Sequence, residues 1–375
     1  MHNDEEWDHK ISEMLNKAND IDETNHQSLS KNGLSEDVQT SILKRGKRKN
    51  RITIILLSLT TLIVVALLVV AFPFSNSIFI NHLFKPDTQD ALRVTSDLIQ
   101  FTKPGVTASI SSEKNNFTSW DFTFNLKEQL GLKEQTVGTF KNEFTFSKLN
   151  GHLKWANGQH ETPFYFRFPG ATFSEGTGDS LNPNGWGTLE KLPEGTVAQL
   201  AISLSRSMTL DEYFNLIKKY DLKTSWLAID TGIEKDLSSK NQFLGSGLVF
   251  GYAPNALNYG SNDNPGNDTI QENGEGERRS QTYMNELLFL INHKKWTDSL
   301  LSIVQTEPQT QKVSLEQRYE YLKKNGVKMY GAILTGPTKE LLKLKENKDF
   351  NTPFVGSIGW WNWDQQSATG VEFDS

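Results

Sequence analysis

The feature that most constrains this chain is an apolar stretch of 21 residues, Ile52 to Phe72, which carries no charged side chain. As a helix it would span roughly 31 Å, about the hydrocarbon thickness of a bilayer. Within lipid, a single segment can satisfy its own backbone amides only as a helix. We therefore predict one transmembrane helix over 52–72. The alternative, a buried helix of a soluble core, fits poorly because core helices of this length usually carry a polar face.

Charges flank this stretch on one side only. Six basic residues directly precede it, and the first charge after it is Lys85. The positive-inside rule therefore predicts a single-pass protein of the cell membrane, with residues 1–51 in the cytoplasm and the chain from 73 onward outside. A cleaved signal peptide is disfavoured because both the leader and its apolar core would be too long. We assign the basic run 44–51 to anchoring on anionic lipid rather than to nucleic-acid binding. The anchor residues are Lys44, Arg45, Lys47, Arg48, Lys49 and Arg51.

The segment 1–43 is short and acidic, with ten acidic residues against three lysines, a net charge of −7. We predict two amphipathic helices in it, over 4–18 and from Ser35 onward. Neither apolar side has enough neighbouring chain to cover it, so we expect the segment to become ordered on a partner protein. A loose helical hairpin or a helix lying on a surface is the alternative. The candidate partner-binding residues are Trp7, Ile11, Met14, Leu15, Ala18, Leu34, Val38 and Ile42.

Beyond the span, we expect Pro73 and Pro86 to break the helix. A second helix is predicted over 87–103, with its apolar residues on one side and Lys103-Pro-Gly at its end. The period then changes to two, which predicts a β-rich module within 73–187. The alternating stretches that indicate half-buried strands are 120–124, 144–146 and 164–168.

The region 188–366 contains two predicted β-α-β units with an insertion between them, which favours a ferredoxin-like α+β domain followed by a tail, 367–375. Thr209 and Glu212 form a capping box at the start of the first helix. The insertion is expected to hold a strand at 247–252, a long loop and helices near 281–304 and 314–324. The elements expected in the two units are strand 197–204, helix 210–220 and strand 224–230, then strand 328–334, a helix with Pro337 at its first position, and strand 354–361.

The sequence offers no pattern typical of catalysis. It has no cysteine, which excludes disulfides, thiolate metal sites and thiol redox chemistry. The block Gly178-Asp-Ser-Leu181 resembles the nucleophile motif of one lipase group, but the required late Asp-x-x-His is missing, so the serine has no base. No histidine pair has the spacing of a zinc site, and no phosphate-binding loop is present. We predict no enzyme activity, no catalytic or metal site and no cofactor.

Three tryptophans near the C-terminus, Trp360, Trp361 and Trp363, could stack on sugars. Strand alternation would turn Trp360 to one face and the other two to the opposite face. One of the two faces is then expected to belong to the core.

Several blocks of sequence are similar to one known family. The first is Ser41-Ile-Leu-Lys-Arg-Gly-Lys-Arg-Lys49, which runs into the apolar stretch. The others are Leu192-Pro-Glu-Gly-Thr-Val-Ala-Gln-Leu-Ala-Ile-Ser-Leu204, Trp226-Leu-Ala-Ile-Asp-Thr-Gly232 and Tyr330-Gly-Ala-Ile-Leu-Thr-Gly-Pro-Thr-Lys-Glu-Leu-Leu-Lys-Leu344. Together they resemble the sigma factor regulator family of Bacillota, the membrane-bound anti-sigma factors for extracytoplasmic-function sigma factors. The His-x3-Cys-x2-Cys cluster of zinc-type anti-sigma factors is absent.

This resemblance implies that the cytoplasmic tail holds an extracytoplasmic-function sigma factor and that the outer domain senses or relays envelope stress. Two routes of release stay open. The outer domain rearranges, alone or with a second membrane protein, or an intramembrane or other protease cuts the 73–104 segment. The competing hypothesis is an envelope-anchored binding or scaffold protein whose outer domain binds a wall polymer. An outer-face hydrolase ranks third because no nucleophile–base pair was found.

Overall fold

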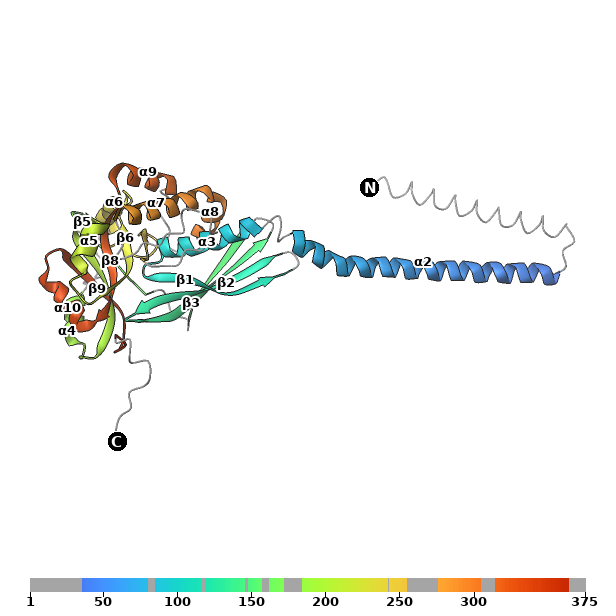
Figure 1. Cartoon of the computed structure of the whole chain (residues 1–375), viewed down its shortest axis with the longest axis horizontal. Helices are drawn as coiled ribbons and strands as arrows, with labels where there is room; N and C mark the ends of the chain where they lie inside the picture. The colour runs from blue at the N-terminus through green and yellow to red at the C-terminus, as the bar shows by residue number, and fades with distance from the viewer. Residues whose placement is uncertain are drawn as a thin grey trace, which may run out of the picture. The chain divides into compact units, whose positions relative to one another are not determined.

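The structure is a computed structural model that describes residues 36–79, 85–116, 119–145, 148–156, 162–171, 184–241, 243–254, 276–304 and 314–363. The chain divides into two compact units, Met1–Ser77 and Ile78–Ser375, and each is described by itself. Figure 1 shows the described helices and strands and labels most of them.

The described part of the first unit is helix α2 (Glu36–Phe79), which runs without a break for 44 residues and ends two residues beyond Ser77. We expected two helices, one starting near Ser35 and one over 52–72, with a break at Pro73. The helix does begin next to Ser35, but it does not end before residue 52 and it continues past Pro73. The basic residues between the two predicted helices are good helix formers, so nothing interrupts the backbone there. A proline inside a long apolar helix removes one hydrogen bond, which such helices tolerate.

The polar side chains within the apolar stretch bond to their own helix. Ser58 Oγ donates to the carbonyl oxygen of Ile55 at 2.9 Å, and Thr61 Oγ1 donates to that of Leu57 at 2.7 Å. Thr53 and Thr60 make the same kind of bond one turn back, to Lys49 and Leu57. Each hydroxyl donor is therefore satisfied without water, as an apolar surrounding requires.

In the second unit, the described residues contain an antiparallel sheet of four strands in the order β1-β2-β3-β4. The strands follow the chain as a meander, and the tight turn between β2 and β3 places Gly131 at φ 62°, a conformation that favours glycine. In β2, Phe122, Phe124 and Leu126 are buried while the residues between them are partly exposed, so the predicted period-two alternation is confirmed there. The bounds are β1 Val106–Asn115, β2 Trp120–Leu130, β3 Lys133–Thr145 and β4 Lys148–Trp155.

The stretch 164–168 is not a strand of this sheet, contrary to the prediction. Phe164, Phe166 and Phe168 are buried and alternate with less buried neighbours, but the backbone makes only an isolated bridge between Phe166 and Leu244. The alternation reflects a segment that lies over the core of the second sheet, where its phenylalanines contact Trp226 and Tyr330.

The second sheet has five described strands in the order β7-β6-β8-β5-β9, and all their pairings are antiparallel. Both predicted β-α-β units are present, and they interleave: β8 lies between the two strands of the first unit, and β5 lies between the two strands of the second. The capping box of Thr209 and Glu212 is formed. Pro337 is the N-cap of its helix rather than the first residue, because the strand continues to it. The elements are β5 Thr196–Thr209, α5 Leu210–Ile217, β6 Lys223–Ile229, β7 Gly251–Tyr252, β8 Lys328–Pro337, α10 Thr338–Lys343 and β9 Phe350–Trp360.

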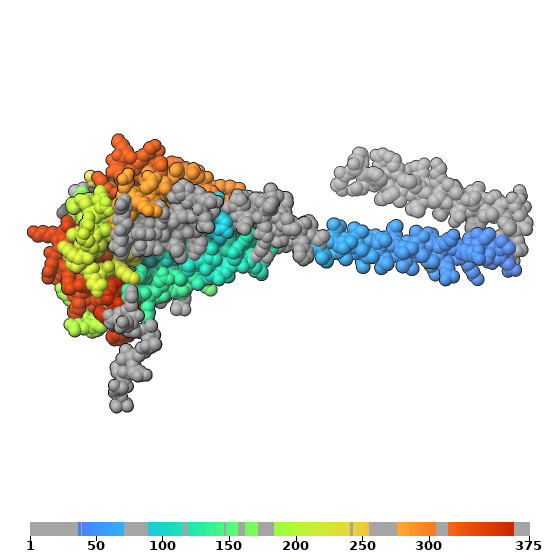
Figure 2. Space-filling model, in the orientation of Figure 1, coloured from blue at the N-terminus to red at the C-terminus, as the bar shows by residue number. Residues whose placement is uncertain are grey.

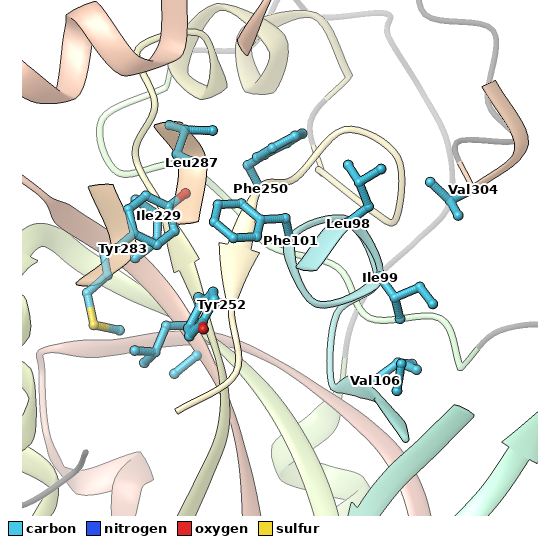
Figure 3. Packing of buried hydrophobic residues seen from close by; sticks show 14 of the residues in the cluster. Leu98, Ile99, Phe101, Val106, Ile229, Phe250, Tyr252, Tyr283, Leu287 and Val304 are labelled. Atoms are coloured by element: carbon cyan, nitrogen blue, oxygen red, sulfur yellow. The ribbon is translucent and has the colours of Figure 1, made fainter. Parts of the chain in front are cut away.

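Helix α3 (Lys85–Thr102) lies at the centre of the second unit. Its residues from Ala91 to Thr102 are all buried, the polar Arg93, Ser96 and Asp97 included. Phe101 stacks on Tyr283 with ring centroids 5.0 Å apart and contacts Phe250 and Tyr252 edge-on (Figure 3). The predicted helix over 87–103 is therefore confirmed, but burial is not limited to its apolar side, because neighbouring elements cover all sides of α3 from Ala91 onward.

Helices of the insertion provide much of that cover. Helix α7 (Gly276–Asn292) and helix α8 (Lys294–Val304) both pack on α3, and α8 also packs on β4. Figure 2 shows the orange surface of α7 to α9 and the blue-green surface of the four-stranded sheet on opposite sides of this unit. One hydrophobic cluster contains buried side chains of both sheets and of α3. The remaining helices are α4 Gly185–Lys191, α6 Glu234–Asn241, α9 Leu315–Asn325 and a short 3-10 turn, Leu344–Glu346.

Candidate functional site

Of the predicted partner-binding residues, the structure describes Val38 and Ile42, which lie one turn apart on α2 with 41% and 58% of their surface exposed. Residues four apart share one side of a helix, so these two form a small exposed apolar patch. Trp7, Ile11, Met14, Leu15, Ala18 and Leu34 lie outside the described residues.

The six predicted anchor residues follow on the same helix, and all are exposed. They are Lys44, Arg45, Lys47, Arg48, Lys49 and Arg51. Because helix α2 is continuous, any rotation or shift of its apolar part moves the basic run and the Val38–Ile42 patch with it.

The described residues include one helix long and apolar enough to cross a membrane, Thr40–Val70, with a mean hydropathy of 2.9 in its most apolar window. No part of that window is buried inside the protein. An apolar surface of this length exposed to water would be strongly unfavourable, at roughly 25 cal/mol per Å². The observed exposure excludes the buried core helix considered above and fits a helix surrounded by lipid.

In the second unit, the most unusual polar arrangement joins α3 to α7. Arg93 of α3 makes a bidentate ion pair with Glu286 of α7, with Nη2 2.9 Å from Oε1 and Nε 3.2 Å from Oε2. The Arg93 guanidinium also lies 4.0 Å from the ring centre of Phe289. A second carboxylate, that of Asp97, is 3.6 Å from Arg93 Nε. The three side chains are 0–3% exposed, so two acids share one cation inside the core.

This arrangement changes the acidity of both carboxyl groups. Burial raises the pKa of Asp97 well above its ordinary value, and the adjacent Glu286 raises it further. Burial also raises the pKa of Glu286, against the opposing effects of the adjacent Asp97 and Arg93. Neither oxygen of Asp97 accepts a hydrogen bond from a described residue. The site therefore favours a bound proton on the two acids, which leaves the cluster neutral with Arg93.

A histidine lies at the rim of the same interface. His293 Nε2 is 3.2 Å from Oδ2 of Asp90 on α3, and its Nδ1 is 2.9 Å from the carbonyl oxygen of Phe289. The ring stacks on Trp296 with centroids 5.4 Å apart. The hydrogen bond to Asp90 raises the pKa of His293. Five side chains, Asp90, Arg93, Asp97, Glu286 and His293, thus tie α3 to α7, and we call them the α3 clasp.

Comparison with known proteins gives two family matches that cover different parts of this architecture. Residues 40–135 match the model described as "Sigma factor regulator N-terminal", and residues 189–357 match the one described as "Sigma factor regulator C-terminal". The chain belongs to the sigma factor regulator family. A relative in Bacillus subtilis (strain 168), named "Probable anti-sigma-M factor YhdL", is 26% identical over 352 residues, which cover 92% of this chain and 88% of that protein. No solved structure gives a significant match.

The N-terminal match of this sigma factor regulator includes most of α2, all of α3 and the first two strands, so it contains Asp90, Arg93 and Asp97 of the clasp. The C-terminal match includes the second sheet, except for the last three residues of β9, together with Glu286 and His293. The clasp therefore joins the two matched modules of the family. Sequence analysis missed it because Arg93 and Asp97, four residues apart, have the spacing of an ordinary surface ion pair on a helix.

The block Trp226–Gly232 of the regulator also leads into a buried polar network. Arg318 on α9 donates to Thr231 and pairs with Glu234 Oε1 at 2.9 Å, while Glu234 Oε2 accepts from the Thr231 amide at 2.8 Å. The guanidinium lies 4.2 Å from the ring centre of Phe250, and Arg318 and Glu234 are 2% and 0% exposed. This network holds α6 and α9 against the end of β6, a structural role that needs no ligand.

The tryptophans near the C-terminus are not buried on either side. Trp360 is 80% exposed and Trp361 is 44% exposed, and Trp363 Nε1 donates to Asp221 at 2.7 Å. The prediction that one face of this strand end belongs to the core is therefore wrong: β9 is an edge strand of the described sheet, and Trp363 on the second face is partly exposed rather than buried. Among the described residues, no three metal-binding side chains come together.

Proposed function

We propose that this chain is a membrane-anchored anti-sigma factor. Its N-terminal tail, residues 1–43, sequesters an extracytoplasmic-function sigma factor. Its C-terminal part lies on the outer side of the membrane and controls the binding of the sigma factor by the tail. The observation that carries the proposal is the pair of family matches, of which the N-terminal one begins with the exposed apolar helix. The name of the Bacillus subtilis relative supports the same function.

The physical basis of capture would be the apolar side of the tail. Trp7, Ile11, Met14 and Leu15 would dock into grooves between sigma-factor helices, in the way that amphipathic helices occupy apolar grooves. The acidic residues of the tail would meet basic surfaces of the sigma factor that otherwise contact polymerase or DNA, which raises the association rate. The bilayer is the second partner, held by the basic run 44–51, and direct nucleic-acid binding and catalysis have no part in this function.

The C-terminal part would serve as the sensor. Its interleaved β-α-β units support a ferredoxin-like classification, with α6 to α9 as an insertion. A signal reaching this part would be passed to the tail either by a rearrangement, alone or with a second membrane protein, or by a protease that cuts the chain between the span and the sheet.

The test is a double substitution in the tail, Trp7→Ala with Ile11→Asp, in the full-length chain. We expect the sigma factor to be released and its reporter to rise to the level of a deletion strain, because a buried anchor is lost and a charge replaces an apolar contact. The matched control is Ile358→Asp with Trp360→Ala, an exposed apolar pair at the end of β9. Unchanged reporter expression in the tail mutant, with normal protein level on an immunoblot, would contradict the proposal.

The alternative, an envelope-anchored scaffold that binds a wall polymer, is favoured by one observation, the exposure of Trp360 and Trp361. The same two mutants separate the hypotheses. A scaffold would lose binding to purified cell walls in the Ile358→Asp, Trp360→Ala mutant, while the tail mutant would have no transcriptional effect.

A further inference from the structure

The buried charges of the α3 clasp balance only when one of its two acids keeps a proton. Asp97 and Glu286 together carry two potential negative charges against the single positive charge of Arg93, and all three side chains are 0–3% exposed. With both acids ionised, the core would contain one uncompensated negative charge. An unpaired buried charge costs several kcal/mol, so loss of the shared proton works directly against the contact between α3 and α7.

His293 depends on protonation for a different reason. Its two ring nitrogens each face an acceptor, the carboxylate of Asp90 at 3.2 Å and the carbonyl oxygen of Phe289 at 2.9 Å. A neutral imidazole has only one N–H, whereas the imidazolium has two, so only the charged ring can donate to both. Deprotonation removes one hydrogen bond and the charge of the pair with Asp90, which also joins α3 to the end of α7.

The pKa shifts agree in sign with this geometry. The pKa values of Asp97, Glu286 and His293 are all raised in the folded protein. A raised pKa gives stability that is complete below the unfolded-state pKa and is lost as the pH rises through the folded-state pKa. The stability contributed by His293 therefore begins to fall near pH 6.5, the unfolded-state pKa of histidine. The stability contributed by the two acids begins to fall near pH 4 and continues to fall well above that pH.

Arg93 and partial burial lower the pKa of His293, but less than its hydrogen bonds to Asp90 and Phe289 raise it. Near α3, the buried phenol of Tyr283 has a pKa raised by burial and stays neutral, and Asn142 of β3 bonds to Thr95 without charge. On α8, Lys294 pairs with Asp298 and Glu316 at the surface, outside the interface.

We propose that the α3 clasp is an alkali-sensitive latch: rising pH on the side of the membrane that holds the second unit loosens α3 from α7. Helix α3 is the first described element after α2 in the chain, so its release would change the attachment of the membrane helix to the sensor. This regulatory step rests on the proposed function, but the latch itself is a property of the isolated chain.

The absence of cysteine allows a direct measurement. Gln89→Cys on α3 and Gln281→Cys on α7 replace exposed residues, and each cysteine can carry a spin label. Pulsed electron paramagnetic resonance on the full chain in nanodiscs then measures the distribution of distances between the two labels. We expect a narrow distribution at about pH 6 and a broader, longer one at about pH 9.5, with the opening constant rising about tenfold per pH unit for each proton released.

The variant Asp97→Asn keeps the shape of the side chain but cannot ionise, and it should hold the narrow distribution to clearly higher pH. Asp298→Asn, an exposed acid on α8, is the matched control and should follow the unmodified chain. If Asp97→Asn does not fold, His293→Gln gives a second test, with opening already increased at about pH 6 and a smaller further response between about pH 6 and about pH 8. A distribution that does not change with pH, or an Asp97→Asn response equal to that of Asp298→Asn, would overturn the latch. Sigma-factor co-purification in the same samples tests the proposed function separately.

Discussion

At the scale of single residues, Arg93 is the side chain on which the centre of the second unit most depends. It is 3% exposed, forms the bidentate pair with Glu286 and lies over Phe289. We predict that Arg93→Met lowers the free energy of unfolding by about 3–5 kcal/mol, because it leaves two carboxyl groups buried without their cation. Urea unfolding of the purified full chain, followed by tryptophan fluorescence, measures the difference.

The control is Lys127→Met, which removes the pair with Glu134 at 2.9 Å between side chains that are 31% and 57% exposed. Exposed pairs contribute about 0–1 kcal/mol, so this substitution should have little effect. Equal losses in the two mutants would show that Arg93 acts as an ordinary surface charge and that the buried cluster adds nothing to stability.

At the scale of elements, patterns local in sequence predicted most of what the structure contains. The apolar stretch, the alternation in β2, the capping box of α5 and the two β-α-β units all depend on neighbouring residues, and all are present. Contacts between distant segments were not predictable in this way. The burial of α3 on all sides depends on α7 and α8, almost two hundred residues away, and no pattern within 87–103 indicates them.

For helix α2, local patterns instead predicted two helices where the structure has one. Separate apolar patterns suggested separate helices, yet the residues between them have no reason to leave the helical conformation, and Gly46 alone does not break it. Six of the eight candidate residues of the tail lie outside the described part of the chain, so their role in partner binding stays a prediction.

The continuity of α2 leads to a prediction about signal transfer. Under the proposed function, movements of the membrane helix reach the tail through the helical turns around Gly46, an exposed position with open space around it. Gly46→Pro should interrupt the helix at a cost of about 3 kcal/mol and uncouple the tail, so that repression persists when the cell envelope is stressed. Gly46→Ala, which stabilises a helix by about 0.5–1 kcal/mol, should keep the normal response. A sigma-dependent reporter followed across several envelope stresses measures both. A full response in Gly46→Pro would indicate release by cutting the chain instead.

At the scale of the whole molecule, the proposed function requires the tail, residues 1–43, and the second unit to lie on opposite sides of one membrane. The basic run before the apolar stretch predicts a cytoplasmic tail and an external second unit. Because the chain has no cysteine, single substitutions can report each side without background. Ser41 on α2 and Ser302 on α8 are both exposed, and neither belongs to the α3 clasp.

We predict that a membrane-impermeant maleimide labels Ser302→Cys in intact cells and leaves Ser41→Cys unlabelled, and that permeabilised cells label both. The thiolate must meet the reagent in water, so labelling reports the compartment rather than the fold. Because residue 41 precedes the basic run and residue 302 lies far beyond the apolar stretch, the two positions report the two ends of a single crossing. Equal labelling of both variants in intact cells would place residues 41 and 302 on the same side of the membrane. A signal from the second unit could then reach the tail without crossing the bilayer. That result would contradict control across the membrane.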